Sequence, residues 1–537
     1  MLCSRIIRVK KRHSGVYNAL EAGFNKLGDW YSATLQRALR FRALVVLLAL
    51  LAFGGGLYMG GLIPGEFAPQ QDQSTMIAAF RGPEGATLEY MDRYLQDVEE
   101  ILADIPEVRT YMGMLGMGGG PPNRGIAFVS LVDRNERERD QFEVMSEVRR
   151  RTAQIPGIMV FLRERSPFGG RQDTRPVQYV IQHPDLSTLA AGSEDLVRRL
   201  RDDPRFLDVD SDLELNKPEL VVQIDRERAA VLGISVAEIS EALQILLGGV
   251  DITEYKERGK QYDVIVRLRE DDRSQPRSLE QIYLRSRGGD LVPLSNLASF
   301  EEEVGPSQIN HFNRVRSVTV AANLEGIALG DALTLVREMA ADIFPPETTY
   351  DVTGTARDME ESFRALFFTL FFAIVVVFLV LAAQFNSWIH PFTIMLGLPL
   401  ALVGAFGALL MTGQTLNIFS FIGLIMLTGL VTKNGILLID YTNRQREAGM
   451  ERNEAVMLAG KVRLRPILMT AVTTIFGVLP IALGLGAGGE SRAPLGIVVI
   501  GGMIVSTLLT LVVVPVIYTL LDDLMNKLKK ATVGTSA

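Results

Sequence analysis

Six stretches of this sequence are apolar and long enough to cross a lipid bilayer, and they are unevenly spaced. A membrane-spanning helix takes about 20 residues, because the hydrocarbon core is about 30 Å thick. One stretch comes first, about 300 more polar residues follow, and five stretches then come in close succession. The sequence therefore predicts a helical membrane bundle with one large extramembranous region. The expected spans are 43–63, 365–383, 391–411, 417–441, 466–486 and 494–520.

Basic residues mark one side of this expected bundle. Cytoplasmic segments close to membrane spans carry an excess of Lys and Arg. Three segments are basic: the residues before the first span, the loop 442–465 and the tail 521–537. All three fall on the same side if all six spans are real. Both termini are therefore expected in the cytoplasm and region 64–364 outside it. No signal peptide is expected, because the first apolar run begins near Ala43.

The composition excludes several classes of protein. Cys3 is the one cysteine, which excludes a disulfide framework and a cysteine metal site. The net charge of −7 gives no nucleic-acid footprint. No G-x-x-x-x-G-K-S/T phosphate loop is present, and the polar region carries no nucleophile–base constellation. We expect neither an enzyme nor a cofactor. The histidines have no metal-ligand spacing and are His13, His183, His311 and His390.

The polar region alternates strand and helix patterns. A first set is expected over 64–165, with strands at 75–80, 125–132 and 157–163 and helices at 87–103 and 140–154. A second set covers 166–214 and 301–358, and it is interrupted by an insert at 215–300 with strands and a helix of its own. Repeated β-α-β units of this kind are typical of small ferredoxin-like subdomains.

Residues 1–42 form a basic leader with an amphipathic pattern. Apolar residues repeat at spacings of three and four over 16–38, which predicts a helix. With Trp30 nearby and the basic leader before it, this helix is expected to lie in the membrane interface. The alternative is a short soluble helix packed on the bundle.

The most informative single residue is Lys433, near the middle of the span 417–441. A lysine at the centre of a membrane helix costs about 2.5–3.5 kcal/mol even on insertion scales, so it normally faces the bundle interior and has a partner. Asp440 lies seven residues on, about 10 Å along the helix and too far for a direct pair. The other spans contain no Asp or Glu, so another polypeptide is expected to supply the carboxylate. The alternative is a lysine that snorkels or bonds to neighbouring Thr and Asn side chains.

A second feature is the Gly- and Met-rich segment from Met112 to Pro122. It has no helix or strand period, so we expect a mobile loop between helix 87–103 and strand 125–132. Glycine permits unusual backbone angles, and methionine makes adaptable apolar contacts, which favours a loop beside a pocket for varied apolar ligands. Thioether binding of a soft cation such as Cu(I) by Met112, Met114 and Met117 is an alternative, and a flexible surface turn is another.

Four strings carry a resemblance to a known family. These strings are Gly61–Phe67 (GLIPGEF), Gly125–Val129 (GIAFV), Leu430–Leu437 (LVTKNGIL) and Arg463–Thr470 (RLRPILMT). With the order of one span, a large polar region and five spans, they are similar to the second half of resistance-nodulation-division efflux pumps, and the chain looks like their hydrophobe/amphiphile multidrug branch. The resemblance covers essentially the whole chain but only half of such a pump.

The resemblance implies a fold and a set of roles. The fold is a membrane α-helical bundle of six transmembrane helices, with a large α+β periplasmic region of ferredoxin-like porter subdomains and an inserted docking subdomain. Lys433 with Asn434, Arg463 and Thr470 would form a proton relay with two aspartates of the absent half. The implied switch loop contains Gly113, Gly116, Gly118, Gly119 and Gly120. The implied substrate pocket contains Met112, Leu115, Met117, Phe128, Phe161 and Arg163.

The implied activity is drug/proton antiport by a transporter in the bacterial inner membrane. The proton-motive force would drive it without a cofactor. The implied partners are the absent N-terminal half, a homotrimer of completed protomers, a periplasmic adaptor and an outer-membrane channel, with apolar small molecules as substrates. Export of copper or silver, and an inactive fragment or structural membrane subunit, are alternatives. The half-length is consistent with a two-gene pump, a truncated gene or an engineered piece.

Overall fold

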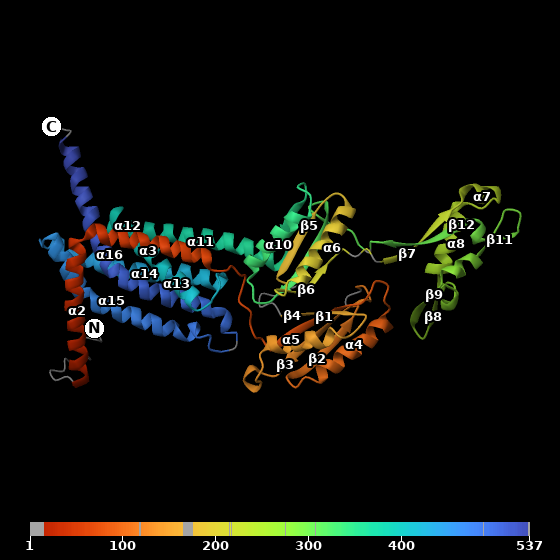
Figure 1. Cartoon of the computed structure of the whole chain (residues 1–537), viewed down its shortest axis with the longest axis horizontal. Helices are drawn as coiled ribbons and strands as arrows, with labels where there is room; N and C mark the ends of the chain where they lie inside the picture. The colour runs from red at the N-terminus through yellow and green to blue at the C-terminus, as the bar shows by residue number, and fades with distance from the viewer. Residues whose placement is uncertain are drawn as a thin grey trace.

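Backbone polar groups have no water to bond with inside a bilayer, so apolar stretches of this length form helices that satisfy their own hydrogen bonds. The computed structural model describes residues 15–116, 120–164, 175–213, 215, 217–273, 275–306, 308–486 and 488–534. The molecule is elongated, with a helical bundle at one end, two α/β subdomains side by side in the middle and a small insertion at the far end (Figure 1).

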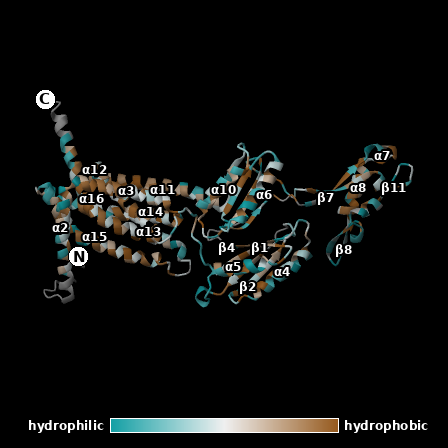
Figure 2. Ribbon diagram, viewed as in Figure 1, coloured by the Kyte–Doolittle hydropathy of each residue, from teal (hydrophilic) through white to brown (hydrophobic). Residues whose placement is uncertain are grey.

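Six helices in the described residues are long and apolar enough to cross a membrane, which confirms the expected span count. They gather in one block of apolar ribbon (Figure 2). Two of the spans are central: 56% of the apolar window is buried in α14 and in the α16 span, against 6% in α3 and α11. The bundle helices are α3 (Arg42–Leu62), α11 (Gly354–Phe385), α12 (Ile389–Met395), α13 (Gly397–Met411), α14 (Ile418–Glu447), α15 (Arg452–Ala482), η6 (Glu490–Arg492) and α16 (Ala493–Gly534).

The amphipathic helix α2 (Gly15–Arg40) runs across the end of the bundle that lies away from the α/β subdomains (Figure 1). Its inner face buries Tyr31 and Leu35, and the Tyr31 hydroxyl donates a hydrogen bond of 2.8 Å to the Leu511 carbonyl of α16. Its outer face leaves Trp30 68% exposed. The helix therefore packs on the bundle, and its place in the membrane interface remains a prediction. The basic residues before Gly15 lie outside the described part of the chain.

Ion pairs tie four helices together at the α2 end of the bundle. The Asp522 carboxylate of α16 pairs with Arg446 of α14 at 3.1 Å and with Arg452 of α15 at 3.2 Å. The neighbouring Asp523 pairs with Arg42 of α3 at 2.7 Å and also with Arg452. Charges held in one geometry by several partners are worth more than isolated surface pairs. This cluster therefore fixes how the helix ends lie against one another.

We expect Asp522→Asn to lower the free energy of unfolding by about 2 kcal/mol, because a hydrogen bond to a charged group is worth about 1.5–3 kcal/mol. Asp29→Asn is the matched control, since the Lys461–Asp29 pair joins side chains that are 56% and 69% exposed. That change should cost about 0.5 kcal/mol or less. Thermal unfolding of the detergent-solubilised chain measures both, and equal shifts in melting temperature would contradict this assignment.

The first subdomain is a four-stranded antiparallel sheet with two helices on one face. Its chain order is β-α-β-β-α-β and its sheet order is β2-β3-β1-β4, the ferredoxin-like pattern. The core lies between sheet and helices, around Met76, Met91 and Leu162. The elements are β1 (Thr75–Arg81), α4 (Leu88–Ala103), β2 (Val108–Leu115), β3 (Arg124–Leu131), η2 (Arg134–Glu136), α5 (Gln141–Thr152) and β4 (Met159–Glu164).

Strand β2 corrects one prediction. The sequence indicated a mobile loop from Met112 onward, but residues up to Leu115 form the end of β2 and pair with β3, Met112 opposite Phe128. No alternating pattern shows in β2, because half of its residues are exposed and none is fully buried. Hydrogen bonding to β3 and packing against α4 impose the strand instead, since β-structure depends strongly on tertiary context.

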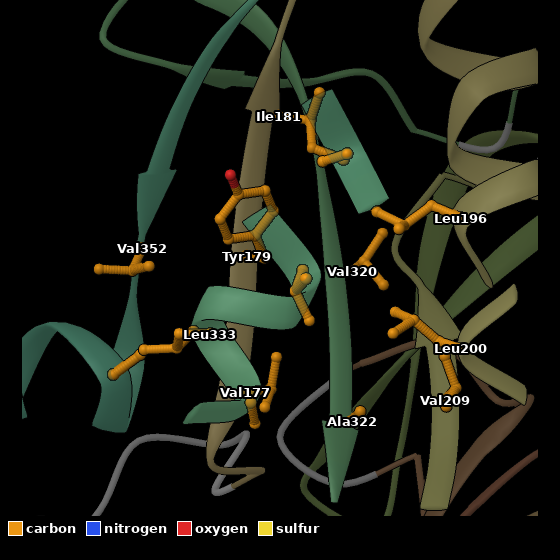
Figure 3. Close-up of a cluster of buried hydrophobic side chains, with 14 of the residues drawn as sticks. Val177, Tyr179, Ile181, Leu196, Leu200, Val209, Val320, Ala322, Leu333 and Val352 are labelled. Atoms are coloured by element: carbon orange, nitrogen blue, oxygen red, sulfur yellow. The ribbon is translucent and has the colours of Figure 1, made fainter. Parts of the chain in front are cut away.

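The second subdomain repeats the same order around a larger core. Strands β6, β14, β5 and β15 lie side by side in that order, and α6 and α10 pack on one face. Figure 3 shows Tyr179, Val320 and Leu196 of this core directed toward one another from two strands and a helix. The elements are β5 (Val177–Gln182), α6 (Leu186–Asp202), β6 (Phe206–Ser211), β13 (Asn310–Phe312), β14 (Val315–Leu324), α10 (Leu329–Ile343) and β15 (Thr349–Val352).

The insertion stands apart from the second subdomain on a two-stranded ribbon of β7 and β12 (Figure 1). It has a small core of its own around Ile239 and Leu294. Its β8–β9 hairpin is almost fully exposed. The elements are β7 (Lys217–Ile224), α7 (Arg226–Val231), α8 (Val236–Leu243), η3 (Gln244–Gly248), β8 (Val250–Glu257), β9 (Lys260–Val266), α9 (Glu270–Arg273), η4 (Pro276–Gln281), β10 (Tyr283–Arg285), β11 (Leu291–Pro293), η5 (Leu294–Asn296) and β12 (Ala298–Gly305).

Candidate functional site

Helix α14 is buried over most of its surface, but one stripe faces outward. Ile422, Met426, Gly429 and Lys433 are exposed and follow one another at intervals of four, three and four residues, which places them on one face of the helix. The rest of the helix packs against α13, α15 and α16. Lys433 therefore stands at the surface of this bundle, on a face that is otherwise apolar.

The Lys433 ammonium has no carboxylate within ion-pair distance among the described residues. Asp440, the nearest acid on the same helix, pairs with Arg444 at 3.1 Å instead. This agrees with the sequence-based view that Asp440 is not the partner of Lys433. An unpaired ammonium facing lipid is costly, whereas one facing another protein with a carboxylate is not. The stripe thus has the chemistry of a protein contact surface.

Asn434, the next residue, points in a different direction. It is 2% exposed, and its Nδ2 donates a hydrogen bond of 3.3 Å to the Thr507 hydroxyl of α16. Its Oδ1 is buried without a hydrogen-bond partner in the described residues. The structure therefore separates the two neighbours, with Lys433 outward and Asn434 inside.

Around Thr507, α16 carries a cluster of buried hydroxyls that the sequence analysis did not single out. Ser506, Thr507 and Thr510 are all at most 4% exposed, and the Ser506 hydroxyl has no hydrogen-bond partner in the described residues. The sequence does carry a signal for them, because three hydroxyl residues lie within five positions of this apolar span. Because such residues also bond to their own helix carbonyls, sequence alone does not show that they face another polar group.

Arg463 and Thr470 lie on α15. The Arg463 guanidinium sits over the ring of Tyr441, 4.7 Å from its centroid, and its buried Nε has no hydrogen-bond partner in the described chain. Tyr441 is eight residues beyond Lys433, about 12 Å along the helix axis. The Thr470 hydroxyl donates to the Ile467 carbonyl of its own helix at 3.0 Å. Neither side chain has a hydrogen bond or ring contact with Lys433 among the described residues.

The helix-free face of the first sheet collects four of the predicted pocket residues. Met112 of β2 lies opposite Phe128 of β3, and both are exposed, at 56% and 40%. Phe161 and Arg163 of β4 share this face, paired with Ala79 and Ile77 of β1. Leu115 is the exception, because it packs against the helix-side core. Met117, the sixth predicted residue, lies outside the described residues.

The predicted switch loop is described only in part. Gly113 lies within β2, where a Cβ would come within 2.8 Å of Leu95 of α4, so glycine lets helix and strand approach closely. Gly116 has a φ of +56°, in the left-handed region that glycine tolerates. Gly120 is an exposed residue just before the turn into β3. Gly118 and Gly119 lie outside the described residues.

At β4 the same face is covered by the second subdomain. The Phe161 ring is 7% exposed and lies under the guanidinium groups of Arg81 and Arg175, 5.7 and 5.4 Å from its centroid. Arg81 pairs with Asp210 of β6 at 2.5 Å. Phe161 is thus held in a contact between the subdomains, while Met112 and Phe128 stay open.

A cleft of about 660 Å³ lies between the two subdomains. Its walls come from Arg81, Pro83 and Met159 on one side, and from Val197 and other residues of α6 on the other. This volume falls in the range of about 300–1,000 Å³ that is usual for small-molecule sites. None of the six predicted pocket residues lines the described part of the cleft.

The fold and the lysine-bearing helix define a polytopic membrane protein with a large α/β region between its first two spans. The family model described as the AcrB/AcrD/AcrF family matches residues 1–522. The chain belongs to this family of resistance-nodulation-division permeases. The members of this family are transporters rather than enzymes.

Curated relatives and a solved structure agree with this assignment. The chain is 30% identical over 528 residues to an uncharacterised transporter of Haemophilus influenzae, covering 97% of this chain and 51% of the relative. It is 31% identical over 534 residues to the multidrug resistance protein MdtC of Proteus mirabilis, covering 98% and 52%. The crystal structure of a heavy metal efflux pump superposes with a TM-score of 0.80 at 26% identity, covering 94% of this chain and 53% of that one. The chain spans about half the length of these relatives.

Proposed function

We propose that this chain is the C-terminal half of a proton-driven pump that exports hydrophobic and amphiphilic compounds. The observation that carries the proposal is the outward stripe on α14, where Lys433 is exposed on an apolar face. An ammonium there needs a carboxylate from outside the described residues, and the part of the family's length that this sequence does not cover is the natural source. The similarity to the multidrug resistance protein MdtC supports the substrate class.

The proposed mechanism starts at this lysine. A carboxylate on the absent half pairs with Lys433 while it is ionised and releases it on protonation. Because an ion pair in a membrane has a strong preference for one geometry, its loss shifts the helices to a second arrangement. We propose that Arg463 and Thr470 line the proton path between this pair and the α2 end of the bundle, Arg463 as a fixed positive charge and the Thr470 hydroxyl as a hydrogen-bond donor and acceptor. The two α/β subdomains, acting as porter subdomains, then open and close around the substrate.

The proposed assembly is that of the whole family. The completed protomer forms a homotrimer in the bacterial inner membrane, with both termini in the cytoplasm and the α/β region in the periplasm. The insertion 215–300 is the docking subdomain, and it stands at the end farthest from the bundle, where it is accessible to an outer-membrane channel and a periplasmic adaptor (Figure 1).

Dye accumulation tests the proposal directly. The chain is expressed alone, and together with a matching N-terminal half, in an efflux-deficient Gram-negative strain that has the adaptor and channel proteins. We expect dye accumulation to fall only in cells that hold both halves. Unchanged accumulation, with both halves shown to be in the membrane, would contradict drug transport and favour an inactive fragment or a structural subunit.

Metal export is a second candidate that two observations favour. The superposed crystal structure is that of a heavy metal efflux pump, and Met112 and Met114 lie two residues apart on one face of β2. Thioethers are soft ligands that suit Cu(I). No group of three or more His, Cys, Asp or Glu side chains within the described residues is arranged to hold a metal ion. Cells that gain resistance to copper or silver from the paired halves, but no resistance to dyes, would show metal export.

The open face of the first sheet supports a prediction about the substrate. Phe128→Ala should lower dye efflux about 10-fold or more, since removing one aromatic stacking and burial contact costs about 1.5–3 kcal/mol of binding. Leu88→Ala is the control, because Leu88 is 55% exposed on α4 and lies away from this face. Equal dye efflux from both variants would show that Phe128 does not contact the substrate.

A further inference from the structure

The segment that follows α3 connects the membrane bundle with the α/β subdomains. The Leu416 N–H in the α13–α14 loop donates to the Pro64 carbonyl at 2.9 Å, and the Glu66 N–H donates to the Leu416 carbonyl at 3.0 Å. The Gly330 N–H, at the start of α10, donates to the Gly65 carbonyl at 2.9 Å. Residues 64–66 are thus bonded to the membrane bundle on one side and to the second subdomain on the other.

Two carboxylates lie at this joint, one in the linker and one at the end of β4. Glu66 accepts a hydrogen bond of 2.9 Å from the Thr415 hydroxyl of the α13–α14 loop. Glu164, at the end of β4 in the first subdomain, accepts one from the backbone N–H of Gln71 and lies within reach of the negative charge of Glu66. Both are partly buried. One acid therefore comes from the linker and the other from the first subdomain, so the pair spans the connection to the membrane bundle.

Among the residues that the structure describes, no charged group neutralises the pair. Asp72, farther along the linker, is occupied by Arg137 and Arg134. Glu490, in the loop before α16, adds another carboxylate and accepts from the Asp72 N–H at 3.4 Å. No Arg or Lys within the described residues lies at ion-pair distance from either carboxylate of the pair. Two acids close together without a cation are difficult to ionise together.

The expected protonation follows from burial and repulsion. Burial, and then the charge of Glu66, raises the pKa of the Glu164 carboxyl to about 7. Burial also raises the pKa of Glu66, and the Thr415 hydroxyl opposes that shift. A carboxyl whose folded-state pKa is raised stabilises the folded arrangement at low pH, and that stabilisation is lost as pH rises through the folded-state pKa. The contact between the first subdomain and the membrane bundle should therefore weaken as pH rises through about 7.

We propose that Glu66 and Glu164 form a proton-binding site outside the membrane, and that a proton held there keeps the first subdomain docked against the membrane bundle. The consequence for transport rests on the proposed proton-driven function and deepens it. The existence of the proton site does not depend on that function. In a pump, this joint would let the pH around the α/β region bias the subdomain movement, independently of the lysine in the bundle.

Infrared difference spectroscopy of the detergent-solubilised full chain tests the site without transport. The C=O stretch of a protonated carboxyl disappears on ionisation, so a titration from pH 5 to about 9 reports acids with raised pKa values. We expect the wild type to lose such a band with a midpoint near 7. Glu164→Gln should remove this band, and Glu66→Gln should move it to lower pH, because the repelling charge is gone. Glu303→Gln, in exposed strand β12, is the matched control and should leave it unchanged.

A band near pH 7 that persists in Glu164→Gln would overturn the proposal. If Glu164→Gln does not fold, Thr415→Val decides instead. It removes the hydrogen bond that favours ionised Glu66, so that acid should ionise at higher pH, and an unchanged titration would count against the site. In cells with both halves, Glu164→Gln should flatten the pH dependence of efflux while leaving efflux active. Absence of efflux in every pairing contradicts the proposed function, and the infrared titration still decides the proton site.

Discussion

Lys433→Met should abolish dye efflux by the paired halves, down to the level of cells without the pump, while the protein is still made and inserted. The change removes the one charge on the outward stripe of α14 and keeps a side chain of similar length. Without an ammonium, protonation of a facing carboxylate no longer breaks an ion pair. Proton binding therefore no longer shifts the helices between their two arrangements.

A second measurement, for which the variant should exceed the wild type, distinguishes loss of the ion pair from misfolding of the variant. Expressed alone, the Lys433→Met chain should accumulate to a higher level than the wild type, because it no longer places an unpaired ammonium on an apolar face at a cost of about 2.5–3.5 kcal/mol. Lys461→Met is the control, since Lys461 is an exposed residue at the α2 end of the bundle. Efflux at the wild-type level from Lys433→Met would contradict the proposed relay.

Gly404→Val should disrupt the bundle, at a cost of about 3 kcal/mol or more in the free energy of unfolding. A Cβ at Gly404 of α13 would lie 2.3 Å from the Gly501 carbonyl oxygen of α16. Backbone atoms cannot move aside as a flexible side chain does, so α13 and α16 would have to separate. Small residues at such crossings are a common means of close helix packing in membranes.

Gly407→Val on the same helix is the matched control. A Cβ there meets no atom within 4 Å, so the change has the same effect on helix propensity but no clash in this chain. Thermal unfolding in detergent, followed by size-exclusion chromatography, should show a large loss for Gly404→Val and a small one for Gly407→Val. Equal losses would show that helix propensity, and not the close approach to Gly501, sets the effect.

Much of the fold was predictable because it depends on local patterns. Long apolar stretches can satisfy their backbone only as helices in a bilayer, so all six spans followed from length and hydropathy alone. Most α/β elements followed in the same way: the helix expected at 87–103 is α4 (Leu88–Ala103). Strand β2 was missed because half of its residues are exposed, none is fully buried and they show no alternation. Its place beside β3 depends on hydrogen bonds to a strand nine residues farther on.

The candidate site was predicted unevenly for a related reason. Lys433 stood out because a charge in an apolar span is rare and costly wherever the helix packs. Its direction was not predictable, since only the packing of α14 shows that Lys433 faces out and Asn434 faces Thr507. Likewise, the sheet puts Met112 and Phe128 on one face and sends Leu115 to the other.

The sequence by itself determined the spans and the two β-α-β sets, and it predicted a partner carboxylate for Lys433, because these depend on residue type and order along the chain. Only the tertiary structure decided which residues meet across distance. It brought Glu66 within reach of the charge of Glu164, 98 positions along the chain, and packed Gly404 against Gly501. Contacts of this kind depend on how the helices and sheets pack together, which no local pattern in the chain records.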